Sequence, residues 1–131
     1  MTLDSMHLVL YAIYAEYQKD LPDMENVSAE ALGMDEDVFN VAVLKLENER
    51  FITGAVFKYV DQLACPIYVS MLKVMPTEKI IDKVTAELKI SARTGSERTK
   101  QLVKRFAGYG WDALTDFTAK VLVELSKQTI K

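Results

Sequence analysis

The feature that most constrains the fold is a change of hydrophobic period within residues 33–54, GMDEDVFNVAVLKLENERFITG. Asp35 can cap a helix, because its carboxylate can accept hydrogen bonds from the free amides of the first turn. Apolar residues then recur at helical spacing from Phe39 to Leu46, which predicts one buried face. At Phe51 the pattern becomes that of a strand, with no loop between. A helix that runs directly into a strand predicts the third helix and first wing strand of a winged helix-turn-helix.

The residues before this stretch predict two more helices and a loop. Residues 4–19 are apolar nearly all round, which is typical of a helix buried by several neighbours, so we expect it to be central. Residues 20–27 are acidic and contain a proline, which predicts a loop. Ser28 can cap a short helix that Gly33 ends. The interval from Ser28 to Arg50 therefore has helix-turn-helix spacing.

After the change of period, residues 51–60 and 67–74 predict two antiparallel strands, joined by a wing tip at 61–66. Pro76 is expected to stop the second strand. Three further helices are predicted at 77–90, from a capping box of Thr94 and Glu97 to Ala107, and at 111–129 after a hinge at 108–110. The fold class is therefore α+β. We expect a winged helix-turn-helix domain over residues 1–75 and a C-terminal helical extension over 76–131, which we expect to dimerise.

Several of these residues also carry a family resemblance: Tyr11-Ala12-Ile13, Phe39, Leu46, Glu49-Arg50 and the start of the strand, Phe51-Ile52-x-Gly54. In these features the chain, over about residues 6–80, resembles the YjcQ family of small winged-helix proteins found in Gram-positive bacteria and their prophages. The resemblance implies a winged-helix, prophage-associated protein with a regulatory role, and it implies no individual functional residue. The segment after residue 90 departs from the shorter family pattern.

Composition argues against several classes of protein. Cys65 is the only cysteine, which excludes an intramolecular disulfide framework. The N-terminus has no basic leader or cleavage site, and no apolar run reaches the ~20 residues of a membrane-spanning helix. His7 is the only histidine, and nucleotide-binding fingerprints are absent. We therefore expect a cytoplasmic protein that is not an enzyme, with no catalytic residues, metal or cofactor, and no membrane.

Charge is divided unevenly along the chain. Residues 1–50 carry 3 basic and 11 acidic side chains, a net charge of −8, and residues 51–131 carry 13 basic and 8 acidic ones, a net charge of +5, which together give −3. Double-stranded DNA would be repelled by the first half and attracted by the second. The alternative is two solvated surfaces of opposite sign that attract each other between protomers.

In helix-turn-helix proteins the third helix enters the major groove, where asparagine can pair with adenine. The nearby acids Glu36 and Asp37 would repel phosphates, so the alternative is a third helix that packs or faces a protein. The basic segment from Lys89 to Arg105 is the stronger electrostatic candidate, and Thr94 to Ser96 could hold a phosphate on free helix amides. The candidate nucleic-acid contacts are Asn40, Lys45, Asn48, Lys58, Arg93, Arg98, Lys100, Lys104 and Arg105.

The last predicted helix has a wide apolar stripe that must be buried. It can fold back on its own domain, or it can pair with the same helix of a second chain to form a homodimer. The candidate dimerisation residues are Trp111, Leu114, Phe117, Val121 and Leu125.

Two functions from different classes follow from these observations. The first is a DNA-binding transcriptional regulator of winged-helix type that acts as a dimer and is prophage-derived. The second is a non-enzymatic interaction module, in which an acidic winged helix binds a basic protein partner instead of DNA.

Overall fold

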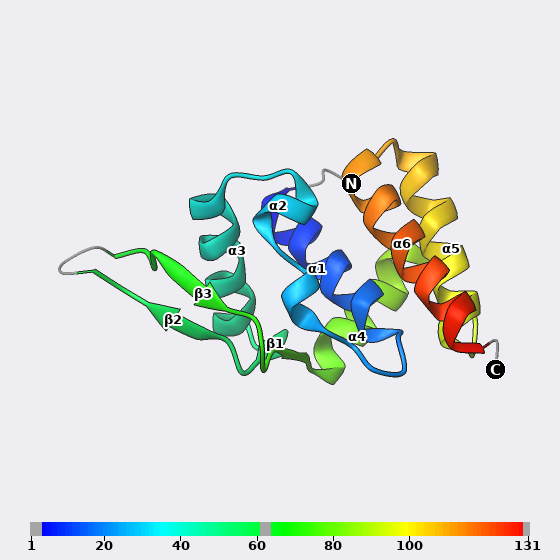
Figure 1. Ribbon diagram of the computed structural model, residues 1–131, viewed down its shortest axis with the longest axis horizontal. Coiled ribbons are helices and arrows are strands. Elements are labelled where there is room, and N and C mark those ends of the chain that lie inside the picture. The colour runs from blue at the N-terminus through cyan, green and yellow to red at the C-terminus, as the bar shows by residue number, and fades with distance from the viewer. Residues whose placement is uncertain (1–3, 61–63, 130–131) are drawn as a thin grey trace.

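Helix α1 runs through the middle of the molecule, and the other elements lie around it (Figure 1). The computed structural model describes residues 4–60 and 64–129, with side chains as far as Lys127. Its elements are, in chain order, α1 (Ser5–Tyr17), the 3₁₀ turn η1 (Met24–Asn26), α2 (Ala29–Leu32), α3 (Glu36–Asn48), β1 (Ile52–Thr53), β2 (Val56–Lys58), β3 (Tyr68–Ser70), β4 (Met75–Pro76), α4 (Glu78–Leu88), α5 (Gly95–Tyr109) and α6 (Asp112–Thr129). Helices and small antiparallel sheets make an α+β fold, as predicted.

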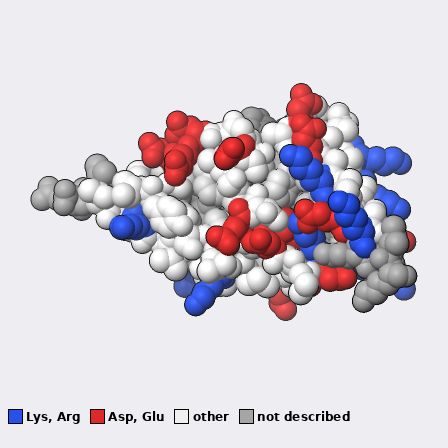
Figure 2. Space-filling view, viewed as in Figure 1, with Lys and Arg blue, Asp and Glu red and all other residues white. Residues whose placement is uncertain are grey.

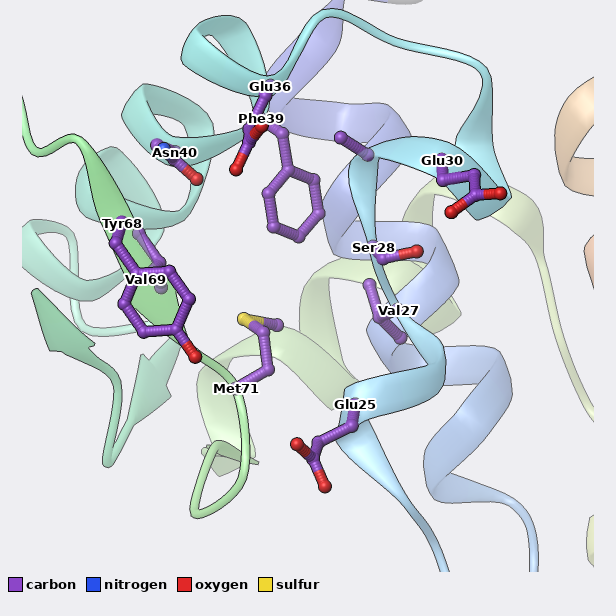
Figure 3. A pocket seen from close by; sticks show the side chains of 11 residues that line it. Glu25, Val27, Ser28, Glu30, Glu36, Phe39, Asn40, Tyr68, Val69 and Met71 are labelled. Carbon is purple, nitrogen blue, oxygen red and sulfur yellow. The ribbon is translucent and has the colours of Figure 1, made fainter.

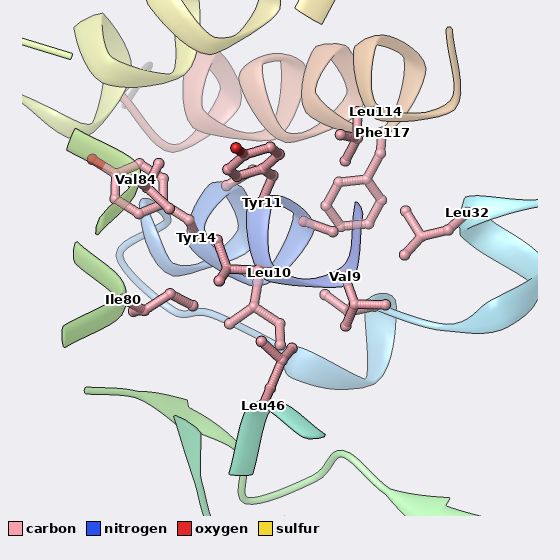
Figure 4. Close-up of a cluster of buried hydrophobic side chains, with 14 of the residues drawn as sticks. Val9, Leu10, Tyr11, Tyr14, Leu32, Leu46, Ile80, Val84, Leu114 and Phe117 are labelled. Atoms are coloured by element: carbon pink, nitrogen blue, oxygen red, sulfur yellow. The ribbon is translucent and has the colours of Figure 1, made fainter. Parts of the chain in front are cut away.

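Helix α1 is buried along most of its length. Every side chain from Val9 to Ile13 is fully inaccessible to solvent, and Tyr14 and Ala15 are buried with them. Helices α3, α4 and α6 pack against it, and apolar side chains from these helices and from α2 converge on it (Figure 4). Apolar burial is the main favourable term in folding, so this helix organises the core. The prediction of a central helix within residues 4–19 is confirmed.

Helices α2 and α3 have the caps that the sequence predicts. The hydroxyl of Ser28 accepts a hydrogen bond from the amide of Ala31 (3.1 Å), and Gly33 ends α2 with a left-handed φ of +64°. The carboxylate of Asp35 accepts a hydrogen bond from the amide of Asp37 (2.9 Å). Helix α3 then turns its apolar stripe towards α1, with the buried residues Phe39, Ala42, Val43 and Leu46.

The predicted hairpin is antiparallel, but its two strands are interrupted. The sequence predicts continuous strands at 51–60 and 67–74, whereas the structure divides each arm in two, so that β1 pairs with β4 and β2 pairs with β3. The second arm ends at Pro76, as predicted, but Met75 and Pro76 themselves form β4, with Pro76 opposite Ile52, so the arm is longer than the predicted strand at 67–74. Part of the predicted tip, residues 61–63, lies outside the described residues.

The interruption arises because the two arms have unequal numbers of residues between their paired segments. Two residues separate β1 from β2, whereas residues 71–74 separate β3 from β4 and form a turn in which the amide of Val74 donates to the carbonyl of Met71 (3.1 Å). Gly54 has a φ of +86°, and a Cβ atom there would overlap the carbonyl oxygen of Lys73. The glycine therefore lets the first arm bend around the turn of the second.

The C-terminal helices differ from the prediction only at their ends. Helix α4 stops at Leu88, two residues earlier than predicted, because Lys89 is left-handed (φ +54°). Helix α5 starts at the predicted cap, where the hydroxyl of Thr94 accepts from the amide of Glu97 (3.1 Å). It extends through Gly108 and Tyr109 of the predicted hinge, and the left-handed Gly110 (φ +75°) ends it. Helix α6 packs beside α5 and against α1 and α2. Among the described residues, no helix is both long and apolar enough to cross a membrane.

A buried ionic cluster joins the end of α1 to the following loop and to α6. One carboxylate oxygen of Glu16 contacts the ammonium group of Lys19 (2.9 Å), accepts from the amide of Asp23 (3.0 Å) and accepts from the side chain of Asn26 (3.3 Å). Lys19 also forms an ion pair with Glu124 of α6. Glu16 is completely buried and Lys19 nearly so, whereas the Glu124 side chain is half exposed. Glu16 therefore joins α1 to Lys19, Asp23 and Asn26 through one buried carboxylate oxygen.

Because of this cluster, we expect the free energy of unfolding to fall at alkaline pH. Burial alone would lower the pKa of Lys19, but the hydrogen bonds with Glu124 and Glu16 outweigh it and leave the pKa above its ordinary value. A cation whose pKa is raised by folding contributes stability that is fully present below its unfolded pKa. That contribution is lost as pH rises through the folded pKa.

Replacing Gly54 with alanine should lower the free energy of unfolding by about 2 kcal/mol or more, because the new methyl group meets a backbone carbonyl and the backbone is left-handed. Gly108 is the matched control, because it lies within α5 with open space around its Cα. Gly108→Ala should raise stability by about 0.5–1 kcal/mol. Urea denaturation measures both changes. Equal effects at the two positions would contradict the close approach of Gly54 to the Lys73 carbonyl.

Replacing Glu16 with alanine should cost about 3–5 kcal/mol of unfolding free energy, because it removes the buried partner of a buried ammonium group. Glu124→Ala should cost about 1 kcal/mol or less, since its carboxylate is half exposed. Equilibrium denaturation of the two variants at neutral pH checks the difference. A larger loss of unfolding free energy in Glu124→Ala than in Glu16→Ala would show that Glu124 of α6 is the main partner of Lys19.

Candidate interaction surface

The exposed face of α3 is acidic. Glu36 and Asp37 are exposed at its start and Glu49 is exposed just past its end, whereas Lys45 is the only basic residue on the helix. Acidic side chains gather over the start of α3 in Figure 2, at the upper left of the view. Asn48 is exposed, but it lies near the C-terminal end of the helix. A helix with this charge pattern would meet phosphate groups with net repulsion.

Two of the predicted basic contacts have partners within the chain. The guanidinium group of Arg98 donates to the carbonyl of Ala92 (3.0 Å), and that of Arg105 donates to the carbonyl of Leu88 (2.9 Å). These bonds satisfy carbonyl groups at the end of α4 and in the link to α5. The remaining basic candidates in this region, Arg93, Lys100 and Lys104, are exposed.

The predicted phosphate position at Thr94 to Ser96 is already occupied by the chain itself. The Thr94 hydroxyl takes one free amide of α5, and Gly95 lies against the carbonyl of Gln18 at the end of α1. A side chain at Gly95 would overlap that carbonyl. The start of α5 therefore faces the end of α1.

The predicted nucleic-acid contacts do not form one surface. Lys45 and Asn48 on α3 and Lys58 on the hairpin lie at one end of the molecule, and α5 lies at the other end, beyond α1 (Figure 1). Several basic side chains lie over α5 and α6 at the right of Figure 2. The predicted contacts are thus divided between the α3–hairpin end and the α5 end of the folded protein.

The predicted dimerisation residues are largely buried within the single chain. Leu114, Phe117, Val121 and Leu125 face the core shared with α1, α2 and α5. Trp111 is half-buried, and its ring stacks on those of Tyr11 and Tyr109 (centroids 5.6 and 4.6 Å apart). The structure therefore adopts the first of the two alternatives, in which the helix folds back on its own domain.

The exposed apolar surface lies on the hairpin instead. Several large side chains there are between 40% and 62% exposed: Val56, Tyr59, Val60, Ile67, Tyr68, Leu72 and Met75. Apolar residues gathered on one element, and not scattered singly, make the hairpin a candidate interaction surface. The sequence contained a signal for this surface, because apolar residues occupy both alternating sets of positions in the first strand.

A cavity of about 330 Å³ opens between the η1–α2 segment, the start of α3 and β3 (Figure 3). Its apolar wall consists of Val27, Phe39, Val69 and Met71, and Tyr68 of β3 also lines it. Its acidic lining consists of Glu25, Glu30 and Glu36, all exposed. Within the described part of the chain, none of these three carboxylates forms an ion pair. The cavity therefore combines an apolar floor with uncompensated negative charge.

Asn40 lies in the wall of this cavity and not on the solvent face of α3. Its side chain is 3% exposed, so in this position it cannot reach a base edge in DNA. Its Nδ2 atom is buried and has no hydrogen-bond partner among the described residues. Figure 3 shows the oxygen end of the amide turned towards the cavity. A buried donor without a partner costs about 1–3 kcal/mol, and the oxygen that faces the cavity is available to a bound donor.

Metal binding finds no support among the described residues. They contain no group of three or more His, Cys, Asp or Glu side chains placed to hold a metal ion, and Cys65 is exposed and free. Comparison of the chain with models of protein families, with curated proteins and with solved structures finds no match in any of the three. The functional argument therefore depends on the geometry and charge of the surface.

Replacing Asn40 with leucine, which has a similar volume, should raise the free energy of unfolding by up to about 2 kcal/mol, because it removes a buried amide that lacks partners. Asn48→Leu on the exposed face of α3 is the control and should change stability by about 0.5 kcal/mol or less. Thermal or urea denaturation of both variants measures these changes in the free energy of unfolding. A clear loss of stability in Asn40→Leu would show that the amide is satisfied in the free protein.

Proposed function

We propose that this chain is a non-enzymatic protein-interaction module of winged-helix shape that binds a basic protein partner. The observation that carries the proposal is the acidic end of the molecule, defined by the exposed carboxylates of Glu25, Glu30, Asp35, Glu36 and Asp37. These carboxylates take part in no ion pair within the described residues. A partner of opposite charge would be steered towards this end and held in register there.

The order of elements supports the winged-helix assignment. Helices α1, α2 and α3 come first, α2 and α3 are joined by a tight turn at Gly33, and an antiparallel hairpin follows α3 directly. In this assignment α3 is the third helix and β2–β3 is the wing. The similarity to the YjcQ family remains a prediction, and nothing in the present proposal depends on it.

Apolar surface next to the acidic end supports a protein partner over a nucleic acid. Val38 and Val41 on α3 border a second cavity, of about 630 Å³, that Met6 of α1 also lines, and the hairpin exposes Tyr68 and Leu72. Protein interfaces combine aromatic and aliphatic anchors with a polar rim, whereas DNA interfaces are polar and strongly basic. The acidic end has the first composition.

A DNA-binding regulator is the second candidate, and one observation favours it. Arg93, Lys100 and Lys104 are exposed together in and before α5, where they could contact phosphates. Against this candidate, α3 carries the wrong charge for groove entry, and Asn40 lies inside the fold.

Two titrations of the full chain separate the candidates. We expect no measurable binding of a fluorescent duplex DNA even at low salt, and salt-sensitive binding of a capped hexa-arginine peptide. Neutralising three acids in Glu30→Gln/Glu36→Gln/Asp37→Asn should weaken peptide binding about fivefold or more. The control neutralises three exposed acids elsewhere, Asp82→Asn/Glu97→Gln/Asp116→Asn, and should bind as the parent does.

The opposite pattern would support the regulator. DNA binding that falls steeply with salt and is lost in Lys100→Glu/Lys104→Glu would contradict the proposal. Peptide binding that is equally weak in both neutralised variants would also contradict it, because the acidic end would then contribute no more than the rest of the surface.

A further inference from the structure

We propose that the cavity at Asn40 receives an extended, arginine-bearing segment of the protein partner, which adds as a strand to the outer edge of β3. This inference rests on the proposed function and specifies the conformation and side chain that the acidic end recognises. Three independent features of the cavity lead to it: an unpaired strand edge, a buried amide without partners, and carboxylates without counter-ions.

The strand edge comes first. In the described part of the chain, β3 pairs only with β2, and Tyr68 to Ser70 form no other backbone hydrogen bond. The cavity lies on the side of β3 away from β2 (Figure 3). An unpaired edge offers a row of free backbone donors and acceptors, and an extended peptide can bind to it as an additional strand. With three residues in β3, the pairing would extend over about 10 Å.

The amide of Asn40 supplies the second contact. The carboxamide oxygen of Asn40 faces the cavity, where it can accept a hydrogen bond from a backbone amide. Asn40 and β3 line the same cavity, so a segment paired with β3 would pass within reach of this side chain. Alternate peptide groups of a strand point to opposite sides. The groups on one edge of the bound segment would pair with β3, and those on the opposite edge would face Asn40. The Oδ1 atom, which faces the cavity, then gains a hydrogen-bond donor from the segment.

The lining selects a cation, and it selects arginine over lysine. The carboxylates of Glu25, Glu30 and Glu36 border the cavity, and a guanidinium group can bind a carboxylate through two parallel hydrogen bonds. The half-exposed ring of Tyr68 offers a face on which a guanidinium can stack. The apolar wall of Phe39 and Met71 suits the methylene stem. The basic helix α5 of a second copy would not fit, because a helix has no free edge to pair with β3.

The probe is a capped heptapeptide of alternating valine and arginine, Val-Arg-Val-Arg-Val-Arg-Val, titrated into the full chain and followed by amide NMR shifts. We expect the shifted signals to come from β3, from Val27 and Ser28, and from the side-chain amide of Asn40. Asn40→Leu, which should fold at least as stably as the parent, should weaken binding about tenfold. The neutralised triple variant Glu25→Gln/Glu30→Gln/Glu36→Gln should weaken it to a similar degree, and Asp82→Asn should not.

Two methylated forms of the peptide test strand addition directly. One carries N-methyl groups on its arginine residues and the other on its valine residues, so each blocks one edge of the extended peptide. We expect one form to lose about tenfold or more affinity relative to the other, because only one edge pairs with β3. A contact made by charge alone would give two equal affinities.

The outcomes separate this inference from the function on which it rests. Equal affinity for both methylated forms, shifts that avoid β3, or no binding of the heptapeptide would overturn strand addition. In each case, hexa-arginine binding that is lost on neutralising the acids of α2 and α3 would leave the proposed function standing. If hexa-arginine does not bind either, both fall.

Discussion

The complete burial of α1 is the constraint on which the rest of the structure depends. A helix without an exposed apolar face must be covered on every side, and one hairpin with two short helices cannot do this. Helices α3, α4 and α6 therefore all pack against it. The residues on both sides of the predicted boundary at 75/76 share one hydrophobic cluster, and α6 uses its apolar stripe there. The surface left for a partner is consequently at the end of the molecule away from α5 and α6, on α3 and the hairpin.

The parts of the fold that depend on local interactions could be predicted from the sequence. The caps at Ser28, Asp35 and Thr94 bond to amides two or three residues away, so composition and spacing identify them. The break in the hairpin could not be predicted, because Gly54 is required by the approach of Lys73 from the opposite arm. The sequence shows a glycine in a strand pattern, but the partner that makes it necessary is a tertiary contact.

The candidate site shows the same division. The acidic character of α3 is visible in the sequence, whereas the roles of Arg98 and Arg105 depend on carbonyl groups brought close by the turn between α4 and α5. The burial of Asn40 could be predicted in part. It follows Phe39 directly and lies three residues before Val43, which places it at the edge of the buried face of the helix. The cavity itself depends on how the loop before α2 lies relative to β3, and no periodicity encodes that.

The most direct test of the account is amide hydrogen exchange over the whole chain, with and without the hexa-arginine peptide. Unpaired carboxylates and unpaired backbone groups are concentrated at the α3–β3 end, whereas α1 is buried and α5 lies outside the proposed binding surface. We therefore predict that the peptide slows exchange in β3 and around η1–α2, and leaves α5 and α6 unchanged. Protection of α5 by the peptide, or no change at the α3–β3 end, would contradict the account.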